Sequence, residues 1–69
     1  MINGLDFIVL QQHVGKKLTS EVEDAMKNDT EFGEIRIVYP STVLELDYRF
    51  DRANIYVDAD NTITRIVIG

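Results

Sequence analysis

The fold is decided by residues 53–68, which read ANIYVDADNTITRIVI. Ala53–Val57 reads as one strand and Thr62–Ile68 as the next. Between them, the turn formers of residues 58–61 change the chain's direction. The pattern therefore predicts a β-hairpin at the end of the chain.

Earlier in the chain, Ile35–Tyr39 also reads as a strand. Pro40 ends it, because proline has no amide proton for a strand ladder. A helix followed by strands, with a crossing connection between the first two, predicts an α+β domain. The expected fold is one short helix packed on a small mixed β-sheet, with an extended exposed loop between two strands.

The expected helix is Ser20–Asp29. Ser20 and Glu23 fit a capping box, with Thr19 as a competing cap. Val22, Ala25 and Met26 form one narrow apolar stripe. A helix this short is marginal alone, so it must dock on the sheet.

The N-terminal segment contains the apolar run Leu5–Leu10, which the residues Val14-Gly15-Lys16 interrupt. We expect residues 1–13 to form an N-terminal arm or a short strand packed on the core. Sixty-nine residues make one domain at most, residues 1–69, close to the lower limit for a self-supporting core.

Composition excludes several classes of function. The chain has no cysteine and one histidine, His13, so a thiolate metal site and a nucleophilic triad are not expected. It has no glycine-rich phosphate loop, and no cofactor, metal or enzyme activity is predicted. A net charge of −5 disfavours nucleic acid and anionic membranes, and no run reaches the roughly 20 apolar residues of a membrane span. We expect a monomer; its compartment is open, with secretion slightly favoured if Met1 is an added start.

The segment Ser41–Arg49 is the most informative about function, because it has turn formers only at its start and apolar residues afterwards. A normal surface loop is more polar. From pattern alone, a further strand or a part of the core is as well supported as an exposed loop.

Residues 47–58, DYRFDRANIYVD, together with Thr64-Arg65-Ile66 and Gly69, resemble the second half of the potato inhibitor I superfamily of serine protease inhibitors. The spacing from Pro40 to Asp47 is most similar to the microbial elastase-inhibitor branch, in which a segment Asp-Tyr-Arg-Pro-Asp-Arg-x-Asn recurs. The sequence departs from the family pattern at Glu45, where threonine is usual, and at Asn54, where the eglin branch has arginine. It also has Ile68 where the microbial branch often has cysteine.

The resemblance implies a reactive bond between Leu46 and Asp47. Leu46 is then the P1 residue, which enters the main specificity pocket of the protease. The other loop residues expected to contact the protease are Val43, Leu44, Glu45, Tyr48 and Arg49. The implied partner is a serine protease with an apolar S1 pocket, of the chymotrypsin, subtilisin or elastase type.

Strand alternation adds a support for this loop. Ala53, Ile55 and Val57 point to one face of their strand, and Arg52, Asn54 and Tyr56 point to the other. The second set is expected to face the loop, where Arg52 and Asn54 can hydrogen-bond its backbone or carboxylates. We expect Glu45 to serve as one acceptor in place of the usual threonine; the alternative is that Arg52 and Asp51 form a solvated charge pair.

Two other functions fit the sequence. One is a non-inhibitory binding module that docks a partner through the exposed apolar segment Val43–Tyr48. The other is an intact scaffold that has lost inhibition because of Glu45. Replacing Leu46 by arginine distinguishes the first of these from an inhibitor, since only an inhibitor's specificity moves toward trypsin.

Overall fold

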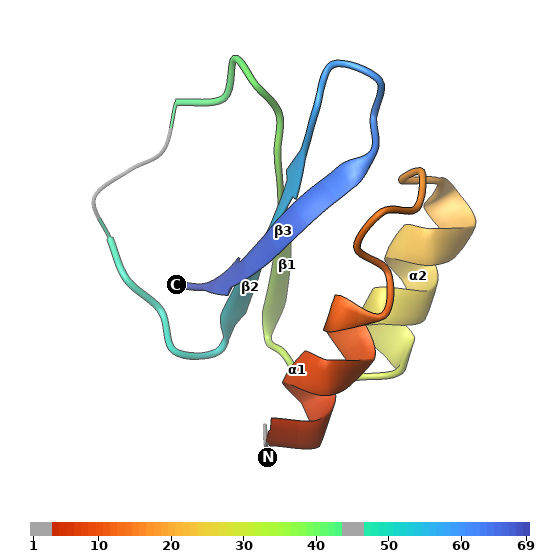
Figure 1. Cartoon of the computed structure of the whole chain (residues 1–69). Helices are drawn as coiled ribbons and strands as arrows, with labels where there is room; N and C mark the ends of the chain where they lie inside the picture. The colour runs from red at the N-terminus through yellow and green to blue at the C-terminus, as the bar shows by residue number, and fades with distance from the viewer. Residues whose placement is uncertain (1–3, 44–46) are drawn as a thin grey trace.

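The computed structural model of the protein describes residues 4–43 and 47–69, which form two helices and a three-stranded sheet (Figure 1). Helices α1 (Gly4–Gln11) and α2 (Ser20–Asn28) come first. Strands β1 (Glu34–Val38), β2 (Arg52–Val57) and β3 (Ile63–Ile68) follow. The predicted α+β class is confirmed, but two helices pack on the sheet where the sequence indicated one.

The sheet is mixed and has the order β1-β2-β3. β2 pairs in parallel with β1 and antiparallel with β3, so it lies in the middle. The predicted hairpin joins β2 to β3: the Asp58 Oδ1 atom accepts hydrogen bonds from the amides of Asp60 and Thr62, and Asn61 takes a positive φ of 65°. Asparagine tolerates this left-handed conformation better than most residues, which explains its place in the turn.

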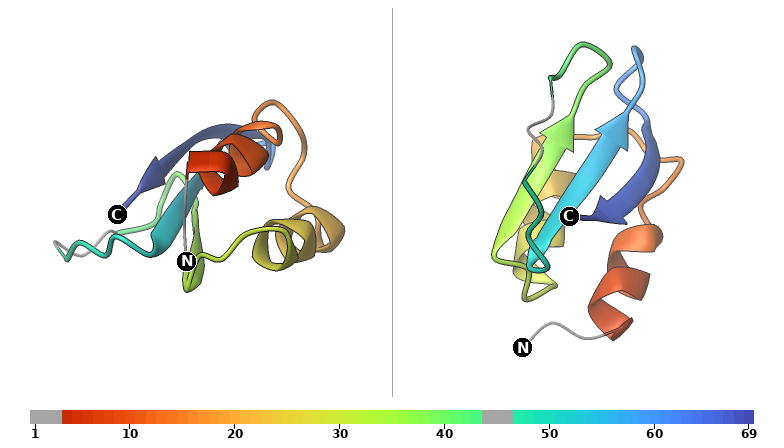
Figure 2. Two further views of the ribbon diagram at one scale, coloured as in Figure 1. Left: turned by 90° about the horizontal axis from the view of Figure 1, so that it is seen from below. Right: turned by 90° about the vertical axis from the view of Figure 1, so that its left-hand side faces the viewer.

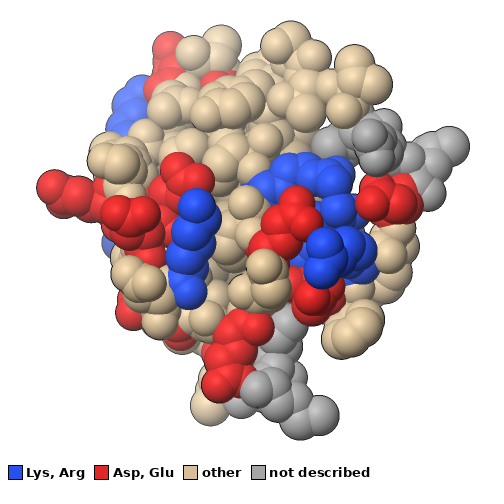
Figure 3. Space-filling model, turned by 180° about the vertical axis from the view of Figure 1, so that it is seen from behind, with Lys and Arg blue, Asp and Glu red and all other residues tan. Residues whose placement is uncertain are grey.

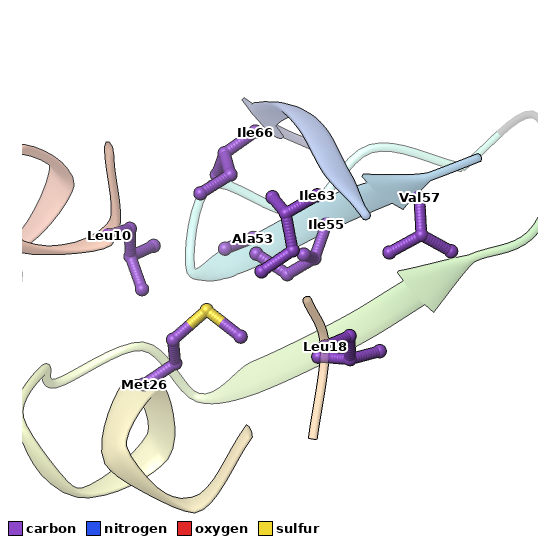
Figure 4. Close-up of a cluster of buried hydrophobic side chains, with 8 residues drawn as sticks. All are labelled: Leu10, Leu18, Met26, Ala53, Ile55, Val57, Ile63 and Ile66. Carbon is purple, nitrogen blue, oxygen red and sulfur yellow. The ribbon is translucent and has the colours of Figure 1, made fainter. Parts of the chain in front are cut away.

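Both helices cover one face of the sheet, with α1 against β3 and α2 against β1 (Figures 1 and 2). The core lies between these layers. Its buried side chains are Leu10, Leu18, Met26, Ala53, Ile55, Val57, Ile63 and Ile66 (Figure 4). Three of them are alternate residues of β2, as the predicted period of two requires.

Helix α1 corrects the expectation of an arm or strand over residues 1–13. Phe7 and Leu10 are three residues apart and both pack on the core, whereas Leu5 and Ile8 are exposed. This is a helical period. The unbroken apolar run Leu5–Leu10 concealed it, because such a run also fits a buried strand.

Helix α2 begins one residue earlier than the predicted capping box requires. The Thr19 side chain is the cap and accepts a hydrogen bond from the Val22 amide at 3.1 Å. Ser20 is therefore the first helical residue, and the competing cap is the correct one. Met26, the last residue of the predicted stripe, is completely buried under the sheet.

The connection from β1 to β2 comprises residues 39–51, and its described parts, residues 39–43 and 47–51, lie on the face opposite the helices (Figure 2). Val38 pairs with Tyr56 and Arg52 pairs with Glu34, so the chain must travel back four residue steps, about 13 Å. Thirteen extended residues reach about 43 Å, roughly three times that distance. The described parts of this connection, residues 39–43 and 47–51, stand away from the sheet and are called the arch (Figure 1).

Candidate functional site

The arch starts with a turn that directs the chain away from β1. The Tyr39 amide donates to the Thr42 hydroxyl at 2.9 Å, and the Thr42 amide donates to the Tyr39 carbonyl at 3.0 Å. Pro40 lies inside this turn, where its fixed φ is favourable. Val43, the next residue, is 90% exposed. The turn therefore delivers an apolar side chain directly into solvent.

The residues predicted for the reactive bond are only partly described. Leu44, Glu45 and Leu46 lie outside the described residues, so the expected roles of Leu46 and Glu45 remain predictions. Asp47 is described, and so are its neighbours in the sequence. The described residues of the Ser41–Arg49 segment are exposed and belong to no strand, which is contrary to a strand or core location.

Arg52 is the principal contact between the sheet and the arch. Its side chain is only 2% exposed. Nη2 donates to the Asp47 carbonyl at 3.1 Å, and the two Nη atoms lie 3.4 Å from the two Asp47 carboxylate oxygens. The guanidinium thus holds the main chain and the side chain of the residue predicted to follow the reactive bond.

Arg52 is itself fixed by the last residue of the chain. Its Nε donates to the Gly69 carbonyl at 2.8 Å, and the Gly69 amide donates back to the Arg52 carbonyl at 2.9 Å. A planar guanidinium bonded along one edge has little rotational freedom at the other. Gly69, which follows β3, therefore orients the Nη atoms of Arg52 toward Asp47.

The charge of Arg52 has an electrostatic effect on Asp47. The pKa of the Asp47 carboxyl is lowered, mainly by the hydrogen bond from Arg52. Burial opposes this effect, and the positive charges of Arg52 and Arg36 lower the pKa further. Asp47 is consequently an anion at neutral pH. The contact between arch and sheet is an ionic one.

A second set of contacts holds residues 47–51, which form the descending limb of the arch. Arg49 donates through Nε and Nη2 to the two carboxylate oxygens of Asp51, at 3.2 and 3.1 Å, and through Nη1 to Glu34 at 3.1 Å. The pKa of Arg49 is raised, chiefly by its hydrogen bond to Asp51. Glu34 also lies 3.9 Å from Arg52, so acidic and basic groups alternate around the base of the arch. Figure 3 shows such an interleaving on the face seen from behind.

The main chain closes the base of the arch at Asp51. The Asp51 carbonyl accepts hydrogen bonds from the amides of Gly33 and Glu34, at 2.8 and 3.3 Å. A Cβ atom at Gly33 would stand 2.5 Å from the Asp51 Oδ2 atom. Glycine is therefore needed here so that the carboxylate bonded to Arg49 can lie against the start of β1.

Asn54, the second predicted support, lies on the loop-facing side of β2 but bonds elsewhere. It is buried, and its Nδ2 donates to the Val67 carbonyl of β3 at 3.3 Å. Its Oδ1 atom is buried and finds no partner among the residues described. Within the described residues, Asn54 thus ties β2 to β3 and makes no hydrogen bond to the arch.

Three parts of this arrangement were absent from the sequence prediction: Glu34, Asp51 in its clamping role, and Gly69 as the support of Arg52. The position of Glu34 depends on the register of β1 against β2. Glu34 pairs with Arg52 in the parallel register, and paired residues share a face of the sheet. That register could not be read before the arch's course was known.

The site is a displayed loop and not an enclosed one. No pocket is found in the surface formed by residues 4–43 and 47–69. Over the same two ranges, His and acidic residues form no group of three that could hold a metal ion. No helix in the described part of the chain is long and apolar enough to cross a membrane. The site is therefore suited to recognition of a partner by an exposed loop that the sheet holds in place.

Comparison with known proteins gives the context of this loop. The model of a family described as the peptidase inhibitor I78 family matches residues 6–69. A solved structure of the elastase inhibitor AFUEI superposes with a TM-score of 0.74 at 25% sequence identity, covering 93% of this chain and 88% of that chain. The search of curated proteins gave no match.

Proposed function

The chain belongs to the peptidase inhibitor I78 family, and we propose that it blocks a serine protease by presenting residues 43–49 as a substrate-like loop. It is accordingly a peptidase inhibitor and not an enzyme. The observation that carries the loop mechanism is the hold of buried Arg52 on the carbonyl and the carboxylate of Asp47.

Bracing of this kind favours tight binding for an entropic reason. A flexible peptide that enters a protease cleft must order about seven to nine residues, at about 1–2 kcal/mol for each backbone. A loop that folding has already ordered avoids most of that cost, so its contact energy appears as affinity. The contacts of Arg52 and Arg49 restrain the limb that begins at Asp47.

The same restraint opposes turnover. If the protease cuts between Leu46 and Asp47, Arg52 keeps the new amine of Asp47 in place beside the acyl-enzyme. Religation then competes with water at a high effective concentration of the amine. The proposed reactive bond is therefore cut slowly and reversibly.

The side chain of Leu46 directs the inhibitor to proteases with an apolar S1 pocket, of the elastase, chymotrypsin or subtilisin type, and away from trypsin. An elastase-like target agrees with the similarity to the elastase inhibitor AFUEI. The placement of the reactive bond before an acidic residue follows the likeness to the potato inhibitor I superfamily. The inhibitor acts as a monomer in this proposal.

The contact roles proposed for Val43 and Tyr48 agree with their exposure, 90% and 72%. Arg49 differs, because its guanidinium is engaged with Glu34 and Asp51. We assign Arg49 to bracing the loop in the free inhibitor. Leu44 and Glu45 keep their proposed places on the other side of the reactive bond.

The test is a titration of elastase, chymotrypsin, subtilisin and trypsin with the purified protein. We expect stoichiometric inhibition of at least one of the first three and none of trypsin. The Leu46→Arg variant should inhibit trypsin and lose its hold on the original target. Ile8→Arg, an equal change on the exposed side of α1, is the control and should leave the profile unchanged. Inhibition that Leu46→Arg does not alter would place the reactive bond elsewhere.

A further inference from the structure

The side chains of the descending limb alternate between two directions. Asp47, Arg49 and Asp51 are each engaged with charged partners at the base of the arch. Tyr48 and Phe50, which lie between them, are 72% and 76% exposed. The limb therefore turns its charges toward the scaffold and its two aromatic rings toward solvent.

Phe50 is held more firmly than an exposed residue usually is. The Arg52 amide donates to the Arg49 carbonyl at 3.3 Å, so Phe50 sits inside a hydrogen-bonded turn. The two hydrogen bonds from the Arg49 guanidinium to the Asp51 carboxylate join side chains across the same turn. Because Phe has only two side-chain torsions, its ring is displayed at little conformational cost.

Phe50 also lies within reach of a protease seated on the loop. Phe50 is three positions after Asp47 in the chain, so their Cα atoms lie at most about 10 Å apart. A protease–inhibitor interface buries about 800 Å² on each partner, which as a disc has a radius of about 16 Å. An interface centred on the proposed reactive bond thus includes Phe50.

We propose that Phe50 is a second protease anchor and a determinant of specificity, acting with Tyr48 on the side of the cleft that receives the residues after the cut bond. The inference rests on the proposed function and deepens it. The ring selects proteases whose surface beside that part of the cleft is apolar. Arg49, which lies between the two aromatics, serves to aim them and does not itself reach the enzyme.

The test compares Phe50→Ala with wild type against whichever of elastase, chymotrypsin and subtilisin the wild type inhibits. Loss of one buried aromatic contact should raise the inhibition constant about 10- to 100-fold. Phe50→Leu should recover most of the affinity, because it restores apolar area. Ile8→Ala truncates an exposed apolar residue on α1, away from the arch, and is the matched control.

Thermal unfolding of Phe50→Ala should match that of wild type, because the ring is largely exposed in the free protein. An inhibition constant within about twofold of wild type would overturn the role of Phe50 and leave the proposed function intact. Equal losses in Phe50→Ala and Ile8→Ala would also overturn it. If the wild type inhibits none of the three proteases, the proposed function fails, and this inference fails with it.

Discussion

Replacing Arg52 by alanine removes the guanidinium that joins the arch to the sheet. The variant loses the bonds to the Asp47 carbonyl and carboxylate and the bond to Gly69. Among residues 4–43 and 47–69, Arg52 makes the side-chain hydrogen bonds that tie Asp47 to the sheet, so the limb is freed at its first residue. The result should be a weaker inhibitor that is cut faster.

The size of the effect follows from ordering entropy. Each loop residue that must be ordered again on binding costs about 1–2 kcal/mol, or about 5- to 30-fold in the inhibition constant. The guanidinium directly fixes one residue, so we expect a loss of at least that size. Stability should fall too, because a charged donor's hydrogen bond contributes about 1.5–3 kcal/mol and the bond to Gly69 is lost.

The assay measures the inhibition constant and the rate of cleavage at the reactive bond, with thermal unfolding as a check that the variant is folded. Arg65→Ala is the control: it removes an arginine of β3 whose guanidinium lies 4.2 Å from the centre of the Tyr56 ring, on the same sheet. Arg52→Lys keeps the charge but loses the fork, so it should recover only part of the affinity. Unchanged affinity and cleavage rate in folded Arg52→Ala would refute the bracing role.

Two further predictions concern the same clamps. Because the pKa of Asp47 is lowered in the folded protein, chiefly by Arg52, its contribution to stability is complete above the carboxyl's ordinary pKa and is lost as pH falls through the lowered value. Thermal unfolding from pH 7 to pH 2 should therefore show a smaller acid loss in Asp47→Asn than in wild type, and equal losses would contradict the ionic contact. Gly33→Ala should destabilise the protein by about 1–3 kcal/mol, because the new Cβ displaces the Asp51 carboxylate from beneath the arch; an unchanged melting temperature would show that this carboxylate moves without cost.

Much of the fold could be predicted from local pattern. The hairpin and the buried face of β2 follow from alternation and turn chemistry, which act within a few residues. Helix α1 could not be separated from a strand, because an apolar run satisfies both periods until its packing partner is known. The choice between Thr19 and Ser20 as the cap of α2 also could not be made from the sequence, since both residue types can cap a helix.

The site was less accessible to sequence reasoning. Arg52 could be placed on the loop-facing side of β2 by alternation, and the structure shows it bonded to Asp47. Its fixation by Gly69 and its approach to Glu34 depend on contacts between distant parts of the chain. Asn54 lies on the same face, but its bond to Val67 shows that a shared face does not determine a side chain's partner.

The most direct measurement of the central claim is mass spectrometry of the inhibitor during incubation with the protease that it titrates. A braced, substrate-like loop predicts one slow cut, between Leu46 and Asp47, that approaches a stable mixture of intact and cut inhibitor while the enzyme remains blocked. Rapid cutting at several bonds of residues 43–49 with recovery of protease activity would contradict the account.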